Sequence, residues 1–446
     1  MTTGKPHVVY VHSHDTGRYV QPYGYAVTTP AYQRLAEEGV VFRQAFSAAP
    51  TCSPSRAALL TGQSPHEAGL LGLVHRGFRL NDPAQHLAMT LQTAGYRTVL
   101  AGAQHTWAGD VAAEGYVEDR RPVDESSESL ANAAIEVITE HAAEERPLFL
   151  DIGFLDTHRV YPEVDAGATT YVRPPALFPD TVETRLDWAR HLASLERLDR
   201  AVGRVLDALD SNGMADNSIV VCTTDHGLAW PGMKCNLTDH GLGVLLILRG
   251  PGDLQGGWVS DALVSQVDVF PTLCEVLEID PPEWLTGTSL MPVVRQEVEQ
   301  VNDDVFGEVT YHAAYEPQRA IRTERWAYIE RYDDRRLTVL PNVDEGETRD
   351  MLLANGWAER EIAPVQLYDT LLDPMQLRNL VDDPAVASVR VELHDRLHAW
   401  MAATHDPILR GPVSMPEGSV ANSVDGRSPN DAPAAAPALA GTTAQA

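Results

Sequence analysis

The chain has 446 residues, of which 44% are hydrophobic and 22% charged, so it is long enough for one large core and a smaller domain. Asp and Glu outnumber Lys and Arg by 63 to 34, and the formal charge of −29 disfavours nucleic acid and anionic membranes as partners. No segment approaches the roughly 20 apolar residues of a membrane helix, and the four cysteines form no CxxC pair, so we expect a cytoplasmic protein.

Short strand-like runs alternate with longer amphipathic stretches along the first 300 residues. Such alternation is typical of an α/β fold with a mainly parallel, buried sheet. In chain order, the sequence predicts the strand His7–His12, the helices Pro30–Glu38 and Gln85–Ala94, the strand Thr98–Ala101, the helix Ser127–Glu144, the strand Leu148–Phe154, the helix Arg185–Leu209, the strands Ser218–Thr224 and Gly243–Leu248, and the helix Asp268–Leu277.

The pattern changes at about residue 301 and again after Pro412. Short β-like pieces and a final helix predict a smaller α+β domain, and the last residues are rich in Pro, Ala, Ser and Gly, which cannot bury a core. We therefore expect domains at 1–300 and 301–412 and a disordered tail at 413–446. The C-terminal elements are the strands Val305–Thr310, Arg319–Arg322 and Trp326–Arg331 and the helix Ala387–Met401.

Polar side chains follow four of the predicted strands directly. They are His14–Asp15, Gln104–His105, Asp156–His158 and Asp225–His226. Open α/β sheets bind their ligands at the carboxyl ends of the strands. The sequence therefore predicts that these residues converge on one edge of the sheet and form the active site there.

The most informative segment runs from Cys52 to Gly62 and reads Cys-Ser-Pro-Ser-Arg-Ala-Ala-Leu-Leu-Thr-Gly. It resembles the sulfatase signature C-x-P-S-R-x-x-x-L-T-G. The resemblance implies that a formylglycine-generating enzyme oxidises Cys52 to an aldehyde, whose hydrate attacks sulfur and later expels sulfate. Arg56, in the first helical turn, can place its positive charge beside the attacking hydroxyl of this hydrate. A buried free cysteine is the alternative, and the fixed Pro, Arg and Thr-Gly spacing argues against it.

The resemblance covers nearly the whole chain up to Pro412. It implies an alkaline-phosphatase-like α/β/α sandwich with a smaller α+β C-terminal domain. The runs VVCTTDHG, VSQVDVFPTL and VQLYDTLLDPMQLRNLVDDP look like the family's late metal-binding strand, the helix before its C-terminal domain and its closing segment. Within the family, CSPSRAALLTG, Asp156–His158 followed by Arg159, FGEVTYH and AWMAATHDP look most like the N-sulfoglucosamine sulfohydrolases.

A divalent metal ion is also implied by the resemblance. Sulfatases hold it, usually as calcium, between an Asp-Asp pair after the first strand and an Asp-Asn or Asp-His pair after a late strand. Asp225 and His226 match the late pair and Asp15 one early position, but the other early position is His14. Imidazole suits zinc or manganese better than calcium. We expect calcium, with manganese and zinc as the alternatives. Either His14 turns away and water completes a calcium site, or the ion is manganese or zinc.

Further positions match the family's proton-transfer and sulfate-binding groups. His105 matches a histidine near the formylglycine, His158 one that contacts the sulfate or the leaving group, and Lys234 a cation that binds sulfate. Lys234 is one of only two lysines in the chain, and Ala103 stands where many sulfatases have another lysine.

From the C-terminal domain we expect His312 and Arg319 to contact the substrate, although packing at a domain interface explains both equally well. The sequence thus predicts a sulfatase that cleaves a sulfate ester or sulfamate of a small anionic sulfated amino sugar. A phosphonate or phosphate ester hydrolase of the same superfamily stays open. So does a catalytically silent binding protein, which Ala103 and His14 favour and the intact C-x-P-x-R core opposes.

Overall fold

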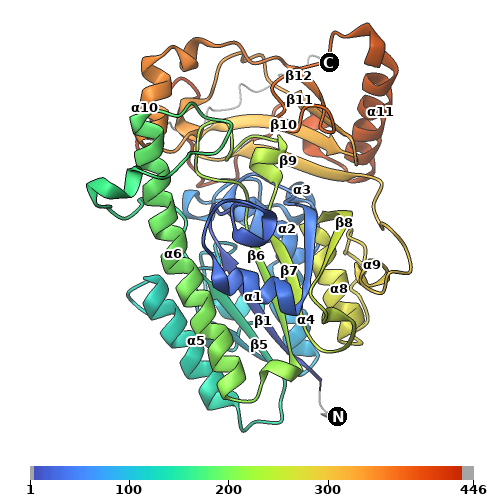
Figure 1. The fold of residues 1–446 in the computed structure, drawn as a ribbon. Coiled ribbons are helices and arrows are strands. Elements are labelled where there is room, and N and C mark those ends of the chain that lie inside the picture. Colours follow the sequence, from blue (N-terminus) through green and yellow to red (C-terminus); the bar gives the residue numbers. More distant parts are fainter. Residues whose placement is uncertain (1–4, 434–446) are drawn as a thin grey trace.

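Runs rich in Val, Ile and Leu form the centre of one eight-stranded sheet in the large domain (Figure 1). The computed structural model describes residues 5–433. The strands of the sheet are β1 His7–Ser13, β2 Val40–Phe46, β3 Arg97–Leu100, β4 Glu118–Asp119, β5 Leu148–Gly153, β6 Ser218–Thr224, β7 Leu246–Arg249 and β8 Trp258–Ser265. Their order is β4-β3-β5-β1-β6-β7-β2-β8, with β1 parallel to β5 and β6, and β7 antiparallel to β6 and β2.

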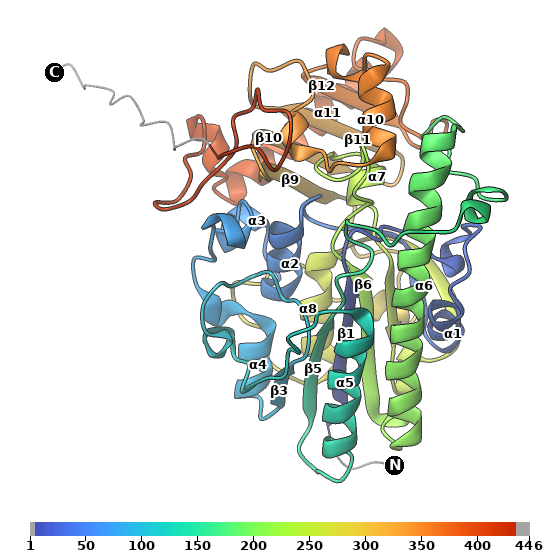
Figure 2. The ribbon, with the colours of Figure 1, turned by 90° about the vertical axis from the view of Figure 1, so that its left-hand side faces the viewer.

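Helices cover both faces of this sheet. They are α1 Pro30–Glu38, α2 Cys52–Thr61, α4 Leu87–Thr93, α5 Ser127–His141, α6 Val182–Ser211, α8 Val269–Val276 and α9 Met291–Val294. Two short helices, α3 Pro65–Ala68 and α7 Asp239–Leu242, lie instead beside the C-terminal domain (Figure 2). Val8 and Tyr10 of β1 pack with α2, α4 and α8, whereas Val9 and Val11 pack with α1, α5 and α6 (Figure 2). Because both faces are buried, the central strands are hydrophobic on both sides. The predicted α/β/α architecture is confirmed.

The C-terminal domain lies over the carboxyl ends of the parallel strands (Figure 1). Its antiparallel sheet has the order β12-β11-β10-β9. One face packs on Phe46, Leu242 and Leu263 of the large domain, and the other on Leu393 and Leu397 of the last helix. Its elements are β9 Val305–Tyr311, β10 Tyr315–Arg322, β11 Trp326–Arg331, α10 Glu347–Ala354, β12 Val365–Asp369 and α11 Ala387–Ala403.

Several elements differ from the sequence prediction. α6 begins at Val182 because the Thr181 side chain accepts from the Thr184 backbone N–H and caps the helix. β2 was not predicted. It follows α1 with only Gly39 between them, so no run of turn residues marks its start. β8 lies at the sheet edge, where its first half alternates exposed and buried residues and lacks the continuous apolar run of the central strands.

The sequence predicts a disordered tail from residue 413, but residues 413–433 pack against both domains. The Val420 N–H donates to the Arg76 carbonyl at 2.9 Å, and the Asn422 N–H donates to the Ala313 carbonyl at 2.7 Å. The Arg76 guanidinium also donates to the Asn422 side-chain oxygen at 2.6 Å. Backbone and amide hydrogen bonds stabilise this segment, which is why its composition did not indicate it. Residues 434–446 lie outside the described part.

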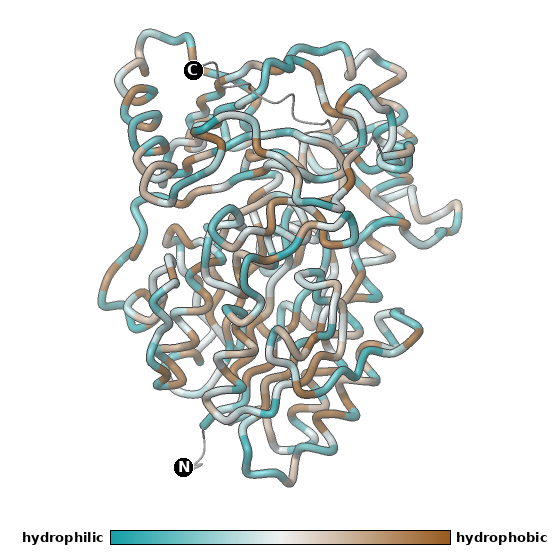
Figure 3. Tube along the Cα trace, turned by 180° about the vertical axis from the view of Figure 1, so that it is seen from behind, coloured by the Kyte–Doolittle hydropathy of each residue, from teal (hydrophilic) through white to brown (hydrophobic). Residues whose placement is uncertain are grey.

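The hydropathy of the trace follows this layering, with hydrophilic stretches mainly on outer loops and helix ends (Figure 3). None of the helices between residues 5 and 433 has both the length and the apolarity needed to cross a lipid bilayer.

Candidate active site

The loops after β1, β3, β5 and β6 meet the start of α2 beneath the C-terminal domain, as the carboxyl-end rule predicts. Gly153 at the end of β5 allows the loop after β3 to pass close to β5. A Cβ there would lie 2.0 Å from the Ala103 carbonyl oxygen, so only glycine lets the loop that carries His105 cross β5. The residues brought together are His14, Asp15, Cys52, Arg56, His105, His158, Asp225, His226, Lys234 and His312.

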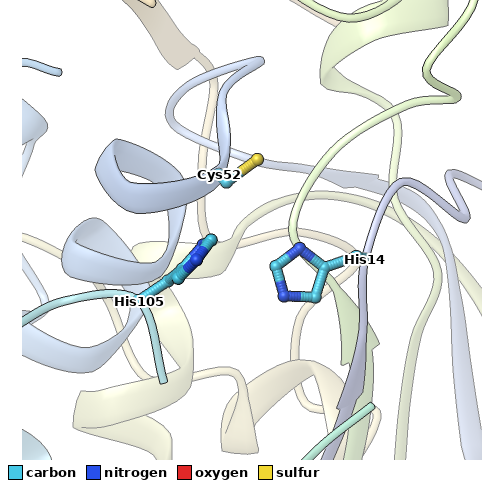
Figure 4. A group of neighbouring side chains, drawn as sticks. All are labelled: His14, Cys52 and His105. Carbon is cyan, nitrogen blue, oxygen red and sulfur yellow. The ribbon is translucent and has the colours of Figure 1, made fainter. Parts of the chain in front are cut away.

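Cys52 is the first residue of α2, and all ten residues of this helix are buried. Its thiol lies 3.4 Å from His226 Nε2, and its sulfur is within 4.8 Å of a ring nitrogen of His14 and of His105, two residues that lie near it in Figure 4. Burial, with smaller contributions from Asp225 and Asp15, raises the pKa of the Cys52 thiol far above its usual range against the pull of Lys234. An unmodified thiol here stays protonated at neutral pH and is not an activated nucleophile.

His226 and Asp15 place two hydrogen-bond acceptors next to each other, an arrangement that a cation between them would stabilise. His226 Nδ1 lies 2.9 Å from the Gly227 carbonyl and must donate to it, because a carbonyl only accepts. In the neutral ring Nε2 is then an acceptor, and it lies 3.2 Å from Asp15 Oδ1. Two acceptors at this distance are stabilised by a proton or a metal ion between them.

His14 points into the same space (Figure 4). Its Nδ1 lies 3.3 Å from Asp225 Oδ2, and neither of its ring nitrogens nor Asp15 Oδ1 has a hydrogen-bond partner among the described residues. Burial, and then the charge of Arg56, keep the pKa of His14 well below its usual range, so the ring is neutral. The ligand atoms of His14, Asp15, Cys52 and Asp225 all lie within 4.8 Å of one another. These residues fit a divalent metal ion, and the His14 ring points toward the other candidate ligands.

Arg56 fixes the Asp225 carboxylate by a buried ion pair. Its Nη2 donates to Asp225 Oδ2 at 3.1 Å and to the Ser13 carbonyl at 2.9 Å, while Nη1 contacts His12 Nδ1. His12 Nε2 in turn lies 2.7 Å from the buried Asp151. Sequence reasoning missed His12 and Asp151, because both lie inside strands whose apolar neighbours indicate only a core.

Lys234 is buried between two carboxylates. Its Nζ lies 3.2 Å from Asp15 Oδ2 and 3.2 Å from Asp344 Oδ2. Burial alone would lower the pKa of Lys234, but Asp15 and Asp344 outweigh it and raise that pKa well above its usual range, so Lys234 stays charged. Asp344 was missed by sequence reasoning. It stands in the loop run Asp-Glu-Gly-Glu, which has neither a strand before it nor a motif spacing.

Three further histidines surround the group. His105 lies with its ring centroid 5.2 Å from that of His14, and burial, with Arg56 and His75 adding to it, lowers its pKa to about 3. His312 is buried, with no hydrogen-bond partner for either ring nitrogen in the described part of the chain. His158 Nε2 lies 3.8 Å from Asp15 Oδ2, and its side chain is 37% exposed. Solvent therefore reaches the group on the His158 side.

A groove begins at His158 and runs along α6. Besides His158 and Arg159 it is lined by Arg197, Arg200 and Arg204, which lie three or four residues apart on one face of the helix. The same groove is also lined by Glu125, Glu128 and Asp156, so cationic and anionic side chains both border it.

The structure corrects the expected place of Arg319, which does not join this group. Arg319 is fully buried, and its guanidinium donates to Asp406 at 2.9 Å and lies 3.1 Å from Glu308. Its remaining donors bond the Val309 and Gln318 carbonyls. Of the two explanations that the sequence left open for this arginine, packing at the domain interface is the one that its contacts support.

An α/β/α sandwich with carboxylates and imidazoles at the carboxyl ends of its strands, and a smaller domain over them, defines a hydrolase of alkaline-phosphatase-like fold. The family profile "Sulfatase" matches residues 6–279, and the profile "N-sulphoglucosamine sulphohydrolase, C-terminal" matches residues 233–352. The chain belongs to the sulfatase family and is a sulfuric ester hydrolase. This confirms the resemblance that the Cys52 segment indicated.

Characterised relatives agree over most of the chain. N-sulphoglucosamine sulphohydrolase of Homo sapiens is 29% identical, with 87% of this chain and 88% of the relative covered. An ulvan-active sulfatase of Formosa agariphila is 26% identical, with 92% and 83% covered.

Solved structures share the fold. One, described as a complex with its substrate D-glucosamine-2-N,6-O-disulfate, has a TM-score of 0.73 at 19% identity and covers 92% of this chain and 99% of that one. The phosphonate monoester hydrolase of Agrobacterium radiobacter has a TM-score of 0.70 at 20% identity, covering 90% and 96%.

Proposed function

We propose that the protein hydrolyses the sulfate ester or sulfamate of a small sulfated amino sugar, with Cys52 oxidised to formylglycine and a divalent metal ion beside it. One observation carries this proposal. The side chain of Cys52, within the sequence that the modifying enzyme reads, lies within 4.8 Å of the ligand atoms of His14, Asp15 and Asp225. The nucleophile position and a set of metal-type ligands thus coincide in one buried place.

The two groups that complete the site supply different chemistry. Formylglycine, made by a formylglycine-generating enzyme, supplies a hydrated aldehyde with one hydroxyl to attack sulfur and a second that allows sulfate to leave. A metal ion held by His14, Asp15, Asp225 and His226 supplies charge that neutralises the sulfate oxygens and lowers the pKa of the attacking hydroxyl. Manganese or zinc suits this set better than calcium, because His14 contributes an imidazole.

The chain's own residues bind the sulfate and move protons. Lys234, charged and fixed by Asp15 and Asp344, is placed to bind sulfate oxygens. His105 is neutral at pH 7, and its Nδ1 has no partner in the described structure, so it can accept a proton from the nucleophile. His158 stands on the open side, where the leaving alcohol or amine emerges, and can protonate it.

Two observations support the proposed substrate class: the residues that line the α6 groove and surround Lys234, and the names of the relatives. Arg197, Arg200 and Arg204 of the α6 groove can pair with an anionic group, while Glu125 and Glu128 on the same groove can accept hydrogen bonds from sugar hydroxyls. Asp344 and His312, which flank Lys234, are placed to bond sugar hydroxyls. The relative from Homo sapiens is named for N-sulphoglucosamine, and the matching C-terminal profile carries the same name. We therefore favour a sulfated glucosamine, with the sulfur on nitrogen.

The test is sulfate release from N-sulfated and O-sulfated glucosamine and from an aryl sulfate, with a phosphate diester and a phosphonate ester assayed beside them. We expect the N-sulfated sugar to turn over fastest. Faster turnover of a phosphorus ester would favour the phosphonate hydrolase alternative. No turnover of any substrate by protein whose Cys52 is shown to be an aldehyde would favour a silent binding protein.

A further inference from the structure

A second group of metal-type side chains lies in the C-terminal domain, between its sheet and α11. Glu330 comes from β11, and His394 and His398 come from α11. The two histidines are four residues apart and therefore project from the same face of the helix toward the strand. None of these residues belongs to the candidate active site.

Each histidine contacts a different oxygen of the Glu330 carboxylate. His394 Nδ1 lies 2.6 Å from Glu330 Oε1, and His398 Nε2 lies 2.9 Å from Glu330 Oε2. One ligand atom from each residue lies within 4.8 Å of the other two. Two imidazoles and a carboxylate are the ligand set that zinc takes when a fourth position stays open to solvent.

Glu330 is fixed by a second layer of hydrogen bonds. The Tyr328 hydroxyl donates to Glu330 Oε1 at 2.5 Å, and the Tyr332 hydroxyl donates to Oε2 at 2.8 Å. Both tyrosines come from the same segment as Glu330, two residues before and two after it. Such donors hold a carboxylate ligand in one orientation and are typical of metal sites built to be rigid.

The site is open to an ion from solvent. The side chains of His394 and His398 are 45% and 35% exposed, whereas that of Glu330 is 10% exposed. By contrast, the cluster of His66, Glu308 and Asp406 is closed, because the Arg319 guanidinium already supplies its cation. Among the clusters of the described residues outside the active site, the Glu330 group combines metal-type ligands with an entry path.

We propose that Glu330, His394 and His398 bind a divalent transition-metal ion of the zinc type, with water in the remaining coordination position. The ion would strengthen the connection of β11 to α11, which also meet through the hydrogen bonds of Glu330 with the two histidines and through apolar contacts of Tyr328, Leu393 and Leu397. Its role is to fix this helix on the sheet, separately from the ion beside Cys52.

The experiment uses full-length protein without an affinity tag, stripped with a chelator and then titrated with Zn²⁺, with bound metal counted per chain. Co²⁺ serves as the spectroscopic probe, because a four-coordinate Co²⁺ site with nitrogen ligands gives a strong visible band. The wild-type chain should bind one equivalent more than the His394→Ala/His398→Ala variant. His405→Asn, which changes an exposed histidine just beyond α11, is the matched control and should keep the wild-type count.

Tyr328→Phe keeps all three ligands and removes one donor to Glu330, so the affinity for Zn²⁺ at this site should fall by about 10–100-fold. This variant tests the site even if the double variant does not fold. Sulfate release by the double variant should equal that of the wild type. An equal metal count in the wild type and the folded double variant, or an unchanged affinity in Tyr328→Phe, would overturn the proposal.

Discussion

The thiol of Cys52 is surrounded by groups of opposite charge, Lys234 on one side and the carboxylates of Asp15 and Asp225 on the other. Burial is the largest of the influences on the thiol, so its pKa is raised and it stays neutral. A neutral thiol offers little to a sulfate ester, whereas a hydroxyl at the same place would lie beside the metal-type ligands. The position is therefore useful for hydrolysis chiefly after oxidation.

Replacing Cys52 tests this directly. Cys52→Ala should abolish sulfate release and change the free energy of unfolding by only about 1 kcal/mol, since one small side chain is lost. Cys52→Ser should stop after a single attack, because serine has no second hydroxyl. Mass spectrometry of the Thr51–Arg56 peptide should show an aldehyde in active wild-type protein. A thiol throughout an active preparation would contradict the assignment.

The metal preference that we propose rests on His14. His14→Asp replaces an imidazole nitrogen by carboxylate oxygens, so reactivation after chelation should shift from manganese or zinc toward calcium. The measurement is activity recovered with each ion, together with metal content. Asp225→Asn is the contrasting variant and should lose the ion, while Asp165→Asn, an exposed acid, should change neither quantity. An unchanged ion preference in His14→Asp would place His14 outside the coordination sphere.

Among the elements, α3, β9 and β10 meet through a buried charge network. His66 Nδ1 lies 3.0 Å from Glu308, and Arg319 bonds both Glu308 and Asp406. When the His66 imidazole is protonated, two positive and two negative groups balance one another there. Removing one member leaves an uncompensated buried charge, which is far more costly than the pair is favourable.

Arg319→Met should therefore lower the free energy of unfolding by about 3–5 kcal/mol, as for other broken buried ion pairs. The KM for sulfated glucosamine should stay close to the wild-type value at a temperature where the variant is folded. Chemical denaturation and steady-state kinetics measure the two effects. A large rise in KM without a loss of stability would return Arg319 to the substrate site.

The same network predicts a pH dependence. Burial alone would lower the pKa of His66, but Glu308 and then Asp406 outweigh it and raise that pKa above its usual value. The folded state then binds the proton more tightly, so the contribution of His66 to stability is complete below about pH 6.5 and is lost as the pH rises through the raised pKa. Unfolding free energies measured from pH 6 upward should fall more steeply for the wild type than for His66→Gln. Parallel curves would contradict this.

At the level of elements, sequence reasoning works best where pattern and burial agree. β1, β5 and β6 are buried on both faces and were predicted within one or two residues. Asp15, His105, His158 and Asp225 were found because polar residues directly follow such strands. Arg319 and Asp344 show where this reasoning fails. Arg319 lies in a strand of the C-terminal sheet, and its side chain is buried at the domain interface, which no sequence pattern indicates. Asp344 reaches Lys234 from a loop whose position depends on tertiary packing alone.

For the whole molecule, the segment of residues 413–433 joins the two domains. Asn422 is nearly inaccessible, and its side-chain amide donates to the Asp431 carbonyl at 2.8 Å while its oxygen accepts from Arg76. Composition did not reveal this, because hydrogen bonds at fixed positions leave no periodic apolar pattern.

Asn422→Ala should therefore cost about 1–3 kcal/mol of unfolding free energy, since it leaves buried polar partners without bonds. Thermal unfolding measures the change, and Asn430→Ala, in an exposed part of the same segment, serves as the control. Equal stability of the two variants would mean that the segment contributes nothing to domain docking.

The burial of α2 also sets an order of events in time. Cys52 is 3% exposed, and the whole of its recognition sequence lies inside the folded molecule, so an oxidising enzyme cannot reach it there. The site cannot close until β1 pairs with β5. His12 and Asp151, which meet across this pair of strands, are 139 residues apart in the chain. Pairing over such a separation is slow, which leaves the nascent chain an interval in which Cys52 is accessible. If Cys52 is oxidised as we propose, oxidation and folding compete, and a chain that folds first is expected to keep its thiol.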